Sequence, residues 1–359
     1  MTDLGTPLDL RHGPTWPNRL ALAPLTNLQS HADGTLSDDE FRWLVRRAEG
    51  GFALVMTCAA YVSREGLSFP GQLGVADDSQ LPGLTRLATA ITDAGAVAAV
   101  QLQHGGRRAD STLSGRGLVA PWTDPAKGAT ALSTEQVQQV VADFVAAAVR
   151  SERAGFAGVE IHGAHGYLVS QFLDARHNHR SDQYGGNAAN RFRIVHEIID
   201  GIRSATGPHF QVGLRLSPER YGVVLDESRA LAAEVLADGK LDYLDLSLWD
   251  AFKYPDEEQH RDRRLIDHFT DLDRGDTRIG VAGKILDTAG ARECLDRGAD
   301  FVLIGTGGIL HHDFARRAIA DDSYRVVDTP VHVDHLTAES VGPRFVDYLA
   351  DRWDDFVIR

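Results

Sequence analysis

The chain has 359 residues, of which 43% are hydrophobic and 25% charged, which is ordinary for a globular protein with a large core. Its formal net charge of −14 disfavours binding to phosphate backbones and to anionic membrane surfaces, so neither nucleic acid nor membrane is expected as a partner. The N-terminus has no basic segment followed by an apolar run, and no apolar stretch approaches the roughly 18 residues of a membrane span. A cytoplasmic protein is predicted.

The two cysteines, Cys58 and Cys294, lie far apart in the sequence. Such spacing supports neither a disulfide framework nor the clustered thiolates of a zinc or iron–sulfur site. Both are expected to be small core residues.

Short apolar segments that predict buried strands alternate with longer amphipathic stretches that predict helices, the pattern of βα units around a parallel sheet. Eight strands are expected, which is a full set for a (β/α)₈ TIM barrel of the α/β class: 20–23, 52–56, 97–101, 158–162, 211–216, 243–246, 278–282 and 301–304. We expect one barrel domain over residues 1–359, with a loop at 327–335 and a closing amphipathic helix at about 341–353.

Residues typical of helix ends support the same order of elements. Four helix starts are expected, at Ser37, Ser133, Asp226 and Asp287. At the first of them, Ser37 and Glu40 are expected to form a capping box. Glycines that follow helical patterns and precede strands are expected at left-handed turns: Gly50, Gly51, Gly95, Gly155, Gly207, Gly239 and Gly298.

The longest breaks in the pattern each follow a strand and so belong to the catalytic face of a barrel: 63–80, 105–132, 168–190 and 249–277. Added length on one face predicts an enclosed ligand. Four aromatic residues on these segments either line a substrate cavity or pack in the core, with neither favoured: Tyr61, Trp122, Trp249 and Tyr254.

Polar residues at the carboxyl ends of the expected strands should converge on one opening of the barrel, here called the mouth. They are Thr26, Gln101, His162, His165, Arg215, Lys284 and Thr306. Two glycine-rich segments follow the seventh and eighth strands, at Gly283-Lys284 and Gly305-Thr306-Gly307-Gly308. Because barrels often bind phosphate at this position, the segments predict a phosphorylated ligand, although each alone is also compatible with a simple tight turn.

His162 ends a strand, and His165 follows three residues later. If the chain turns helically there, both imidazoles face the same side and two N–H donors can hold one carbonyl oxygen as negative charge develops on it. Tyr167, two residues further on, can deliver a proton. A zinc site is the main alternative, but the other strand ends offer too few ligands, and a purely structural role is the third reading.

Gln101, Arg215 and Thr26 together suit a flavin. An amide side chain can match the donors and acceptors of the pyrimidine edge, and a cation near N1 stabilises the reduced anion. Each of the three residues alone is more often an ordinary polar residue near a strand end.

Four segments make the chain similar to a known family: N-R-L-A-L-A-P-L-T from Asn18, Q-L-Q-H-G-G-R from Gln101, G-V-E-I-H-G-A-H-G-Y-L-V-S-Q-F-L from Gly158 with N-x-R-x-D-x-Y-G-G-N from Asn178, and G-K-I with I-G-T-G-G near the end. On these motifs the chain resembles the Old Yellow Enzyme family of FMN-dependent ene-reductases, also called NADH:flavin oxidoreductases, from the first strand to about Ala320. The third segment is the most specific, and its 178–187 portion is expected to be structural rather than catalytic.

The resemblance implies that the isoalloxazine and ribityl parts of FMN contact Pro24, Leu25, Thr26, Ala59, Gln101 and Arg215. It implies that the phosphate is held by Gly283, Lys284, Gly305 and Thr306. NAD(P)H would first reduce the flavin. His162 and His165 would then bind the carbonyl of an α,β-unsaturated substrate, FMN N5 would give hydride to the β-carbon, and Tyr167 would protonate the α-carbon.

Two departures from the family pattern affect the expected site. Thr306 stands where many relatives have Arg, so Lys284 is the expected phosphate cation, and Thr26 stands where one branch has Cys. The iron–sulfur and FAD domains of some relatives are not expected, so electrons should come directly from nicotinamide. A flavin-binding protein without turnover and a metal-dependent hydrolase remain alternatives, and Arg344 raises the option of a homo-oligomer in which it reaches a neighbouring site.

Overall fold

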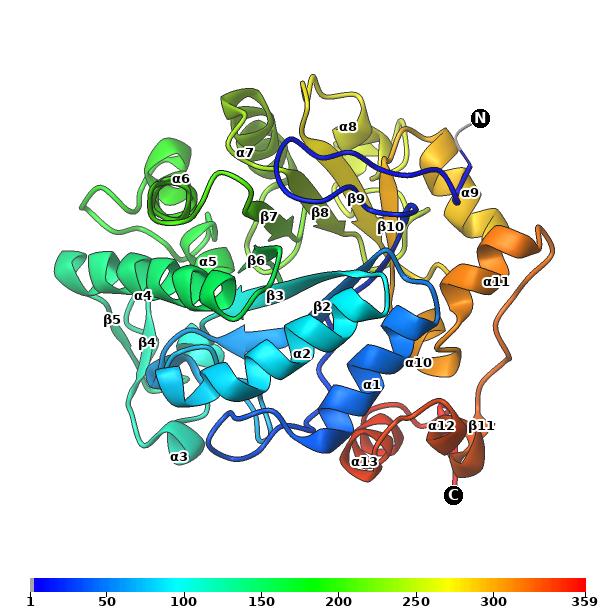
Figure 1. Ribbon diagram of the computed structural model, residues 1–359. Helices are drawn as coiled ribbons and strands as arrows, with labels where there is room; N and C mark the ends of the chain where they lie inside the picture. The colour runs from blue at the N-terminus through cyan, green and yellow to red at the C-terminus, as the bar shows by residue number, and fades with distance from the viewer. Residues whose placement is uncertain (1–2) are drawn as a thin grey trace.

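The structure is a computed structural model that describes residues 3–359. Eight parallel strands close into a barrel whose neighbours follow chain order, β1 being hydrogen-bonded to both β2 and β10 (Figure 1). The barrel strands are β1 Leu20–Leu22, β2 Leu54–Tyr61, β3 Val97–Gln103, β6 Gly158–Gly163, β7 Gln211–Leu216, β8 Tyr243–Ser247, β9 Arg278–Ala282 and β10 Phe301–Ile304. All eight predicted strands and the (β/α)₈ fold class are confirmed.

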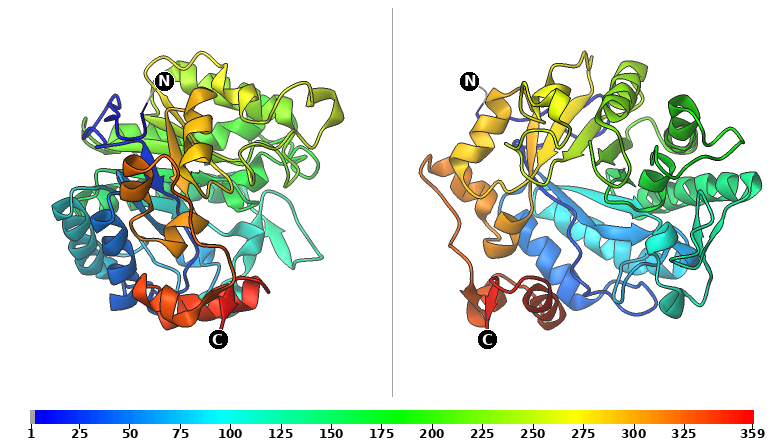
Figure 2. Two further views of the ribbon diagram at one scale, coloured as in Figure 1. Left: turned by 90° about the vertical axis from the view of Figure 1, so that its right-hand side faces the viewer. Right: turned by 180° about the vertical axis from the view of Figure 1, so that it is seen from behind.

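Helices cover the outside of the barrel between successive strands (Figures 1 and 2). Those of the outer layer are α1 Asp38–Glu49, α2 Leu81–Asp93, α4 Thr134–Arg153, α6 Ala188–Ala205, α7 Leu225–Asp238, α8 Asp267–Thr270, α9 Thr288–Asp296 and α11 Phe314–Ala320. Shorter helices follow strands or lie in the C-terminal segment: α3 Ser111–Ser114, α5 Leu168–Phe172, α10 Thr306–Leu310, α12 Val333–Ala338 and α13 Pro343–Arg352. Among the helices of residues 3–359, none is both long and apolar enough to cross a membrane.

Aromatic side chains fill the end of the barrel opposite the mouth. Trp16 lies edge-on to Phe301, with ring centroids 4.9 Å apart, and edge-on to Tyr243 at 5.5 Å. A Cβ on Gly213 would lie 2.1 Å from the Tyr243 ring and one on Gly280 would lie 2.2 Å from the Phe301 ring, so glycine at these strand positions makes room for the rings. The interior is therefore packed, and ligands are confined to the mouth.

The predicted helix starts are confirmed at three positions and lie within one residue at the fourth. Ser37 accepts a hydrogen bond from the backbone N–H of Glu40, and Ser133 and Asp287 cap α4 and α9. Helix α7 begins one residue before Asp226, after Val224 as N-cap, so Asp226 lies in the first turn. The Glu40 carboxylate does not complete a capping box, because it accepts hydrogen bonds from Asn27 and Ser30 in the core.

Two of the predicted left-handed glycines have other conformations. Five of the seven have positive φ: Gly51, Gly95, Gly155, Gly239 and Gly298. Gly50 has a φ of −75°. A side chain is excluded there by the close approach of the backbone at His312, since a Cβ on residue 50 would lie 1.8 Å from His312 O. Gly207 follows Thr206, an extended C-cap, so the chain leaves α6 without a left-handed residue.

The C-terminal segment is more ordered than the predicted loop at 327–335. Strand β11, Val331–His332, pairs with β12, Val357–Ile358, and α12 begins at Val333. Helix α13 lies inside the range expected for the closing helix, and both helices lie beside α1 (Figure 2). Buried Arg47 of α1 donates hydrogen bonds to Gly308 O (3.0 Å) and Glu339 O (2.6 Å), which joins α1 to α10 and α12.

Candidate active site

The mouth of the barrel collects the polar residues that the sequence places at strand ends. His162 is in β6, Arg215 in β7 and Gln101 in β3, and the strand register sets His162 opposite Arg215. The longest connections leave the same ends of the strands. They include a small sheet of β4, Leu118–Ala120, with β5, Ala129–Ala131, and four 3₁₀ turns at 64–66, 78–80, 106–108 and 258–260.

The two histidines converge, but not through the predicted helical turn. His165 has a φ of +59°, in the left-handed region, and α5 begins only after Tyr167. This reversal, together with a hydrogen bond from His165 N to Ser217 Oγ (3.1 Å), brings His165 Nδ1 to 3.3 Å from His162 Nε2. The ring centroids are 5.0 Å apart and the planes nearly perpendicular at 78°.

Both imidazoles are held neutral by their surroundings. Burial lowers the pKa of His162 well below its ordinary value, and electrostatic interactions with His165, Arg215 and Arg108 lower it further. Burial also lowers the pKa of His165 to about 3, with Arg215 and Arg108 acting in the same direction. A neutral imidazole donates only one N–H, so hydrogen bonding must decide which nitrogen carries it.

Ser247 of β8 contacts His165 from the side opposite His162. Its Oγ lies 2.7 Å from His165 Nε2 and also accepts from Arg215 Nη2 at 3.4 Å. When the Ser247 hydroxyl donates to Nε2, the proton of His165 is at Nδ1. That tautomer directs its N–H toward His162.

Tyr167 completes a group of three side chains. Its ring lies 5.2 Å from that of His162, and the Arg108 guanidinium lies 4.7 Å from the tyrosine ring. Burial raises the pKa of Tyr167, although Arg108 partly opposes this, so the phenol keeps its proton at neutral pH. Arg108 also donates to His165 O, which ties the segment after β3 to the segment after β6.

A polar layer of charged and amide side chains lies inside the barrel below the histidines. Gln101 Nε2 donates to Glu160 Oε1 at 2.7 Å, and Arg215 Nε lies 2.9 Å from Asp245 Oδ2. Gln101, Glu160, Arg215 and Asp245 are all at most 5% exposed. The sequence-based site omits Glu160 and Asp245, yet a signal was present, because each stands two positions from another inward-facing residue of its strand, His162 and Tyr243.

The segment expected to contact the ring system of FMN follows β1. Pro24, Leu25 and Thr26 are partly exposed there, whereas Ala59 is buried in β2 beside Gln101. The pairing of β2 with β3 shifts register between Met56 and Ala59, an irregularity of the kind that redirects side chains next to sites.

The two glycine-rich segments lie at the ends of β9 and β10, as expected. Lys284 has a φ of +49° and its Nζ lies 3.6 Å from Asp250 Oδ2, with the side chain 63% exposed. Gly305 is the N-cap of α10, and Thr306 begins it. A hollow of about 510 Å³ contains Leu25 and Thr306 together with Arg325, whose backbone bridges to Asp287 after β9. Arg325 is a second cation near the expected phosphate position, and it was missed because its segment reaches the site only through long-range pairing.

A groove of about 680 Å³ opens beside the ends of β1 and β2. It is lined by Arg64, Phe69, Thr112, Arg344 and Tyr348 among others. Arg344, which the sequence suggested could reach a neighbouring chain, lines the groove of its own chain and donates to Ser30 O at 3.4 Å.

The four aromatic residues of the long connections differ in environment. Tyr61 is buried and donates to Asp33 O at 2.9 Å, so it belongs to the core. Trp122 stacks on His177, with ring centroids 5.2 Å apart. Trp249 and Tyr254 are 63% and 51% exposed, so neither is a core residue. Cys58 and Cys294 are buried and free, as predicted.

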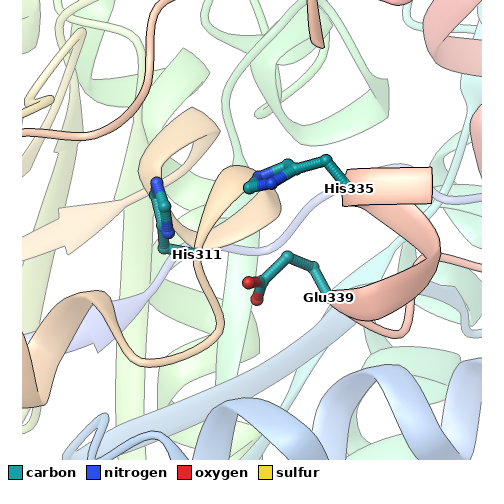
Figure 3. A group of neighbouring side chains, drawn as sticks. All are labelled: His311, His335 and Glu339. Atoms are coloured by element: carbon teal, nitrogen blue, oxygen red, sulfur yellow. The ribbon is translucent and has the colours of Figure 1, made fainter. Parts of the chain in front are cut away.

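Within residues 3–359, the one cluster of three or more side chains with metal-ligand spacing is His311, His335 and Glu339, which does not include His162 or His165 (Figure 3). His311 Nε2 accepts the N–H of Val327 at 3.2 Å, so neutral His311 carries its proton on Nδ1. A protonated nitrogen has no lone pair for a cation. His335 Nε2 donates to Leu310 O (2.7 Å), so these hydrogen bonds favour a structural link between α10 and α12.

Comparison with known proteins places the chain in a family. Residues 3–266 match the model of the NADH:flavin oxidoreductase / NADH oxidase family. The chain is 40% identical over 255 residues to the probable NADH-dependent flavin oxidoreductase YqiG of Bacillus subtilis (strain 168), covering 68% of each chain. It is 33% identical over 333 residues to the NADH:fumarate oxidoreductase of Klebsiella pneumoniae (strain 342), covering 88% of this chain but 36% of that relative.

The fold is similar to that of a solved Old Yellow Enzyme homologue from Zymomonas mobilis. The TM-score is 0.80 at 26% identity, and the alignment covers 93% of this chain and 96% of the other.

Proposed function

Since the chain belongs to the NADH:flavin oxidoreductase / NADH oxidase family, we propose that it reduces the activated C=C bond of α,β-unsaturated carbonyl compounds. The protein is an oxidoreductase, with FMN as cofactor and NADH or NADPH as reductant. The proposal assigns substrate binding to His162 and His165 and proton donation to Tyr167.

The residues at the mouth fit FMN. Gln101 is fixed by Glu160, and Arg215 of β7 supplies a buried cation that acts on the same Glu160. An amide and a cation suit the pyrimidine edge and the negative charge of its reduced form. Pro24, Leu25, Thr26 and Ala59 would border the rings. The phosphate would lie at Gly283, Lys284, Gly305 and Thr306, with Arg325 as the further cation.

Bound FMN supplies the hydride that it has received from the nicotinamide. The protein residues bind and polarise the substrate. A carbonyl oxygen would replace the His162–His165 hydrogen bond and accept one N–H from each ring. His162 accepts in that hydrogen bond, so it must move its proton from Nδ1 to Nε2 to become the second donor. His165 can donate from Nδ1 when Ser247 donates to its Nε2, so the serine sets the required tautomer. Two such donors stabilise the enolate-like oxygen as charge develops on it.

Tyr167 holds the proton that the α-carbon needs. Its raised pKa keeps the phenol protonated, and its ring contact with His162 places it beside the carbonyl-binding pair. Arg108 covers the tyrosine ring and restricts water on that side. The observation that carries the proposal is this group of two neutral imidazoles and one protonated phenol around a single point of the mouth.

The purified protein should be yellow, and NADPH should bleach it in the absence of oxygen. Steady-state turnover of cyclohexenone and of maleimide then tests the proposed reaction. Bleaching without turnover of either compound would favour a flavin-binding protein without ene-reductase activity. A colourless protein that ignores added FMN, with stoichiometric zinc by metal analysis, would favour a hydrolase.

A further inference from the structure

The polar layer inside the barrel contains more negative than positive groups. Glu160 of β6 and Asp245 of β8 surround Arg215 of β7, and both carboxyl groups are fully buried. With every group ionised the layer would carry one net negative charge in a medium of low dielectric constant. Such an uncompensated buried charge is costly, and two carboxyl groups in this situation usually retain a proton.

The hydrogen bonds of the layer are incomplete in a way that points to a proton. Within the part of the chain that the structure describes, Glu160 Oε2 and both carboxyl oxygens of Asp245 are buried and accept no hydrogen bond. Arg215 Nε is 2.9 Å from Asp245 Oδ2, but its N–H is not aligned with that oxygen. One carboxyl O–H would provide a donor where acceptors are in excess.

The groups that face Glu160 come from each neighbouring inward position. Gln101 of β3 donates to its Oε1, while Arg215 of β7 and Asp245 of β8 act on it through their charges, and Glu160 in turn raises the pKa of Tyr243 of β8. Burial raises the pKa of Glu160, the charge of Asp245 raises it further, and Arg215 and Gln101 oppose the shift. Burial likewise raises the pKa of Asp245, against the effect of Arg215.

We propose that Glu160 and Asp245 share one proton beneath the flavin, and that Glu160 is thereby a positioning residue that fixes the Gln101 amide and adjusts the reduction potential of FMN. The amide is fixed because Oε1 of Glu160 accepts from Nε2 of Gln101, which leaves the amide oxygen of Gln101 free for the cofactor. The inference rests on the proposed contacts of Gln101 and Arg215 with FMN.

The proton is linked to the redox state through charge. A hydride from NAD(P)H carries two electrons and one proton into the site, NAD(P)⁺ leaves, and the site gains one negative charge. That charge raises the proton affinity of the carboxyl pair. At alkaline pH, where the pair has lost its proton in the oxidised enzyme, reduction therefore draws one proton from solvent onto Glu160 Oε2.

The test is a spectroelectrochemical titration of the FMN-loaded enzyme between pH 6 and 10. The slope of the midpoint potential against pH reports how many protons the enzyme takes up with each two electrons. In the wild type this number should rise from one to two as pH rises through the titration of the pair. Glu160→Gln keeps an acceptor for Gln101, so the variant should retain FMN. Its reduction should take up only one proton per two electrons at every pH in this range.

Two further variants make the result decisive. Asp245→Asn leaves the Glu160 carboxyl beside the Arg215 cation alone, so Glu160 ionises at lower pH. The region of two-proton slope should then move below pH 6. Glu40→Gln is the matched control, since Glu40 is also fully buried with a raised pKa but lies on α1, and the steepening should persist. Steepening that survives Glu160→Gln or Asp245→Asn, or that is missing from the wild type, would overturn the proposal. If instead the wild type binds no FMN, the proposed function itself fails.

Discussion

His165 Nδ1 lies 3.3 Å from His162 Nε2, so the nitrogens that would bind a substrate oxygen are hydrogen-bonded to each other. A neutral pair of this kind is preorganised, because the left-handed backbone of His165 and the contact with Ser247 hold the second ring in place. Substrate binding exchanges one hydrogen bond between the rings for two to an oxygen, provided that His162 then carries its proton on Nε2.

The first prediction concerns the two donors. His162→Ala and His165→Ala should each lower the rate at which cyclohexenone reoxidises the reduced enzyme by about 10²- to 10³-fold, the effect of removing one donor to a developing oxyanion. Asparagine at either position retains an N–H and should lose less.

The matched control is His196→Ala, since His196 lies on the outer helix α6 and pairs with Glu234. The measurement is the rate at which enone reoxidises the NADPH-reduced enzyme. Rates for both alanine variants equal to that of the control would show that the pair does not bind the carbonyl.

The second prediction separates proton donation from flavin reduction. Tyr167→Phe should slow reoxidation by enone by about 10²-fold or more, because the α-carbon loses its positioned proton donor. Bleaching of the flavin by NADPH needs no such proton and should change little. Stopped-flow absorbance resolves the two half-reactions, with Tyr254→Phe, at a 51% exposed position, as control. An equal loss in both half-reactions would point to damage of the FMN site instead.

The barrel could be predicted because its strands are buried on both faces. Segments such as 52–56 and 301–304 are therefore continuous apolar runs, and the strand ends then define where polar residues converge. Local sequence could not predict the conformation of His165, since φ > 0 is uncommon for a non-glycine residue and depends here on contacts with Ser217 and Ser247.

Long-range pairing explains the other omissions. The prediction of a loop at 327–335 failed because β11 pairs with β12, a partner near the end of the chain. The same principle applies to Arg325, which reaches the hollow of Thr306 through a bridge to Asp287. Proximity of this kind is set by the tertiary fold and has no signal in the residues next to Arg325.

The third prediction asks which cation meets the phosphate of FMN. Thr306 cannot supply the charge, and two candidates remain: Lys284, whose Nζ lies 3.6 Å from Asp250 Oδ2, and Arg325, which lines the same hollow as Thr306. Lys284→Ala and Arg325→Ala should each weaken FMN binding by about 10- to 100-fold, the range for losing a hydrogen bond to a charged group.

Fluorescence titration of the apoprotein with FMN measures the two affinities, and titration with riboflavin, which has no phosphate, provides the contrast. Riboflavin binding should be unaffected by either substitution. The control is Lys127→Ala, in the connection between β4 and β5, which should change the affinity for neither FMN nor riboflavin. Unchanged FMN affinity in Lys284→Ala would remove Lys284 from the phosphate site and leave Arg325 as the remaining candidate.

The last prediction concerns stability against pH. His104 lies fully buried after β3, where burial lowers its pKa to about 4 from 6.5. Because the unfolded chain binds the proton more tightly, the stabilisation is complete above pH 6.5 and is lost as pH falls toward 4. Between pH 7.5 and 4.5 this one residue should reduce the free energy of unfolding by roughly 2 to 3 kcal/mol.

His104→Asn isolates this contribution. His104 Nδ1 accepts the N–H of Gly106 at 3.1 Å, and the asparagine oxygen can replace it, so the variant keeps the hydrogen bond and loses the titration. Urea unfolding at several pH values should give a shallower acid decline than in the wild type, whereas His196→Asn, at a partly exposed site, should follow the wild-type curve. Parallel curves for wild type and His104→Asn would mean that the imidazole becomes charged without unfolding, through local opening of the segment after β3. Because that segment also holds Arg108 over Tyr167, the same opening would then appear as a loss of enone reduction at acid pH.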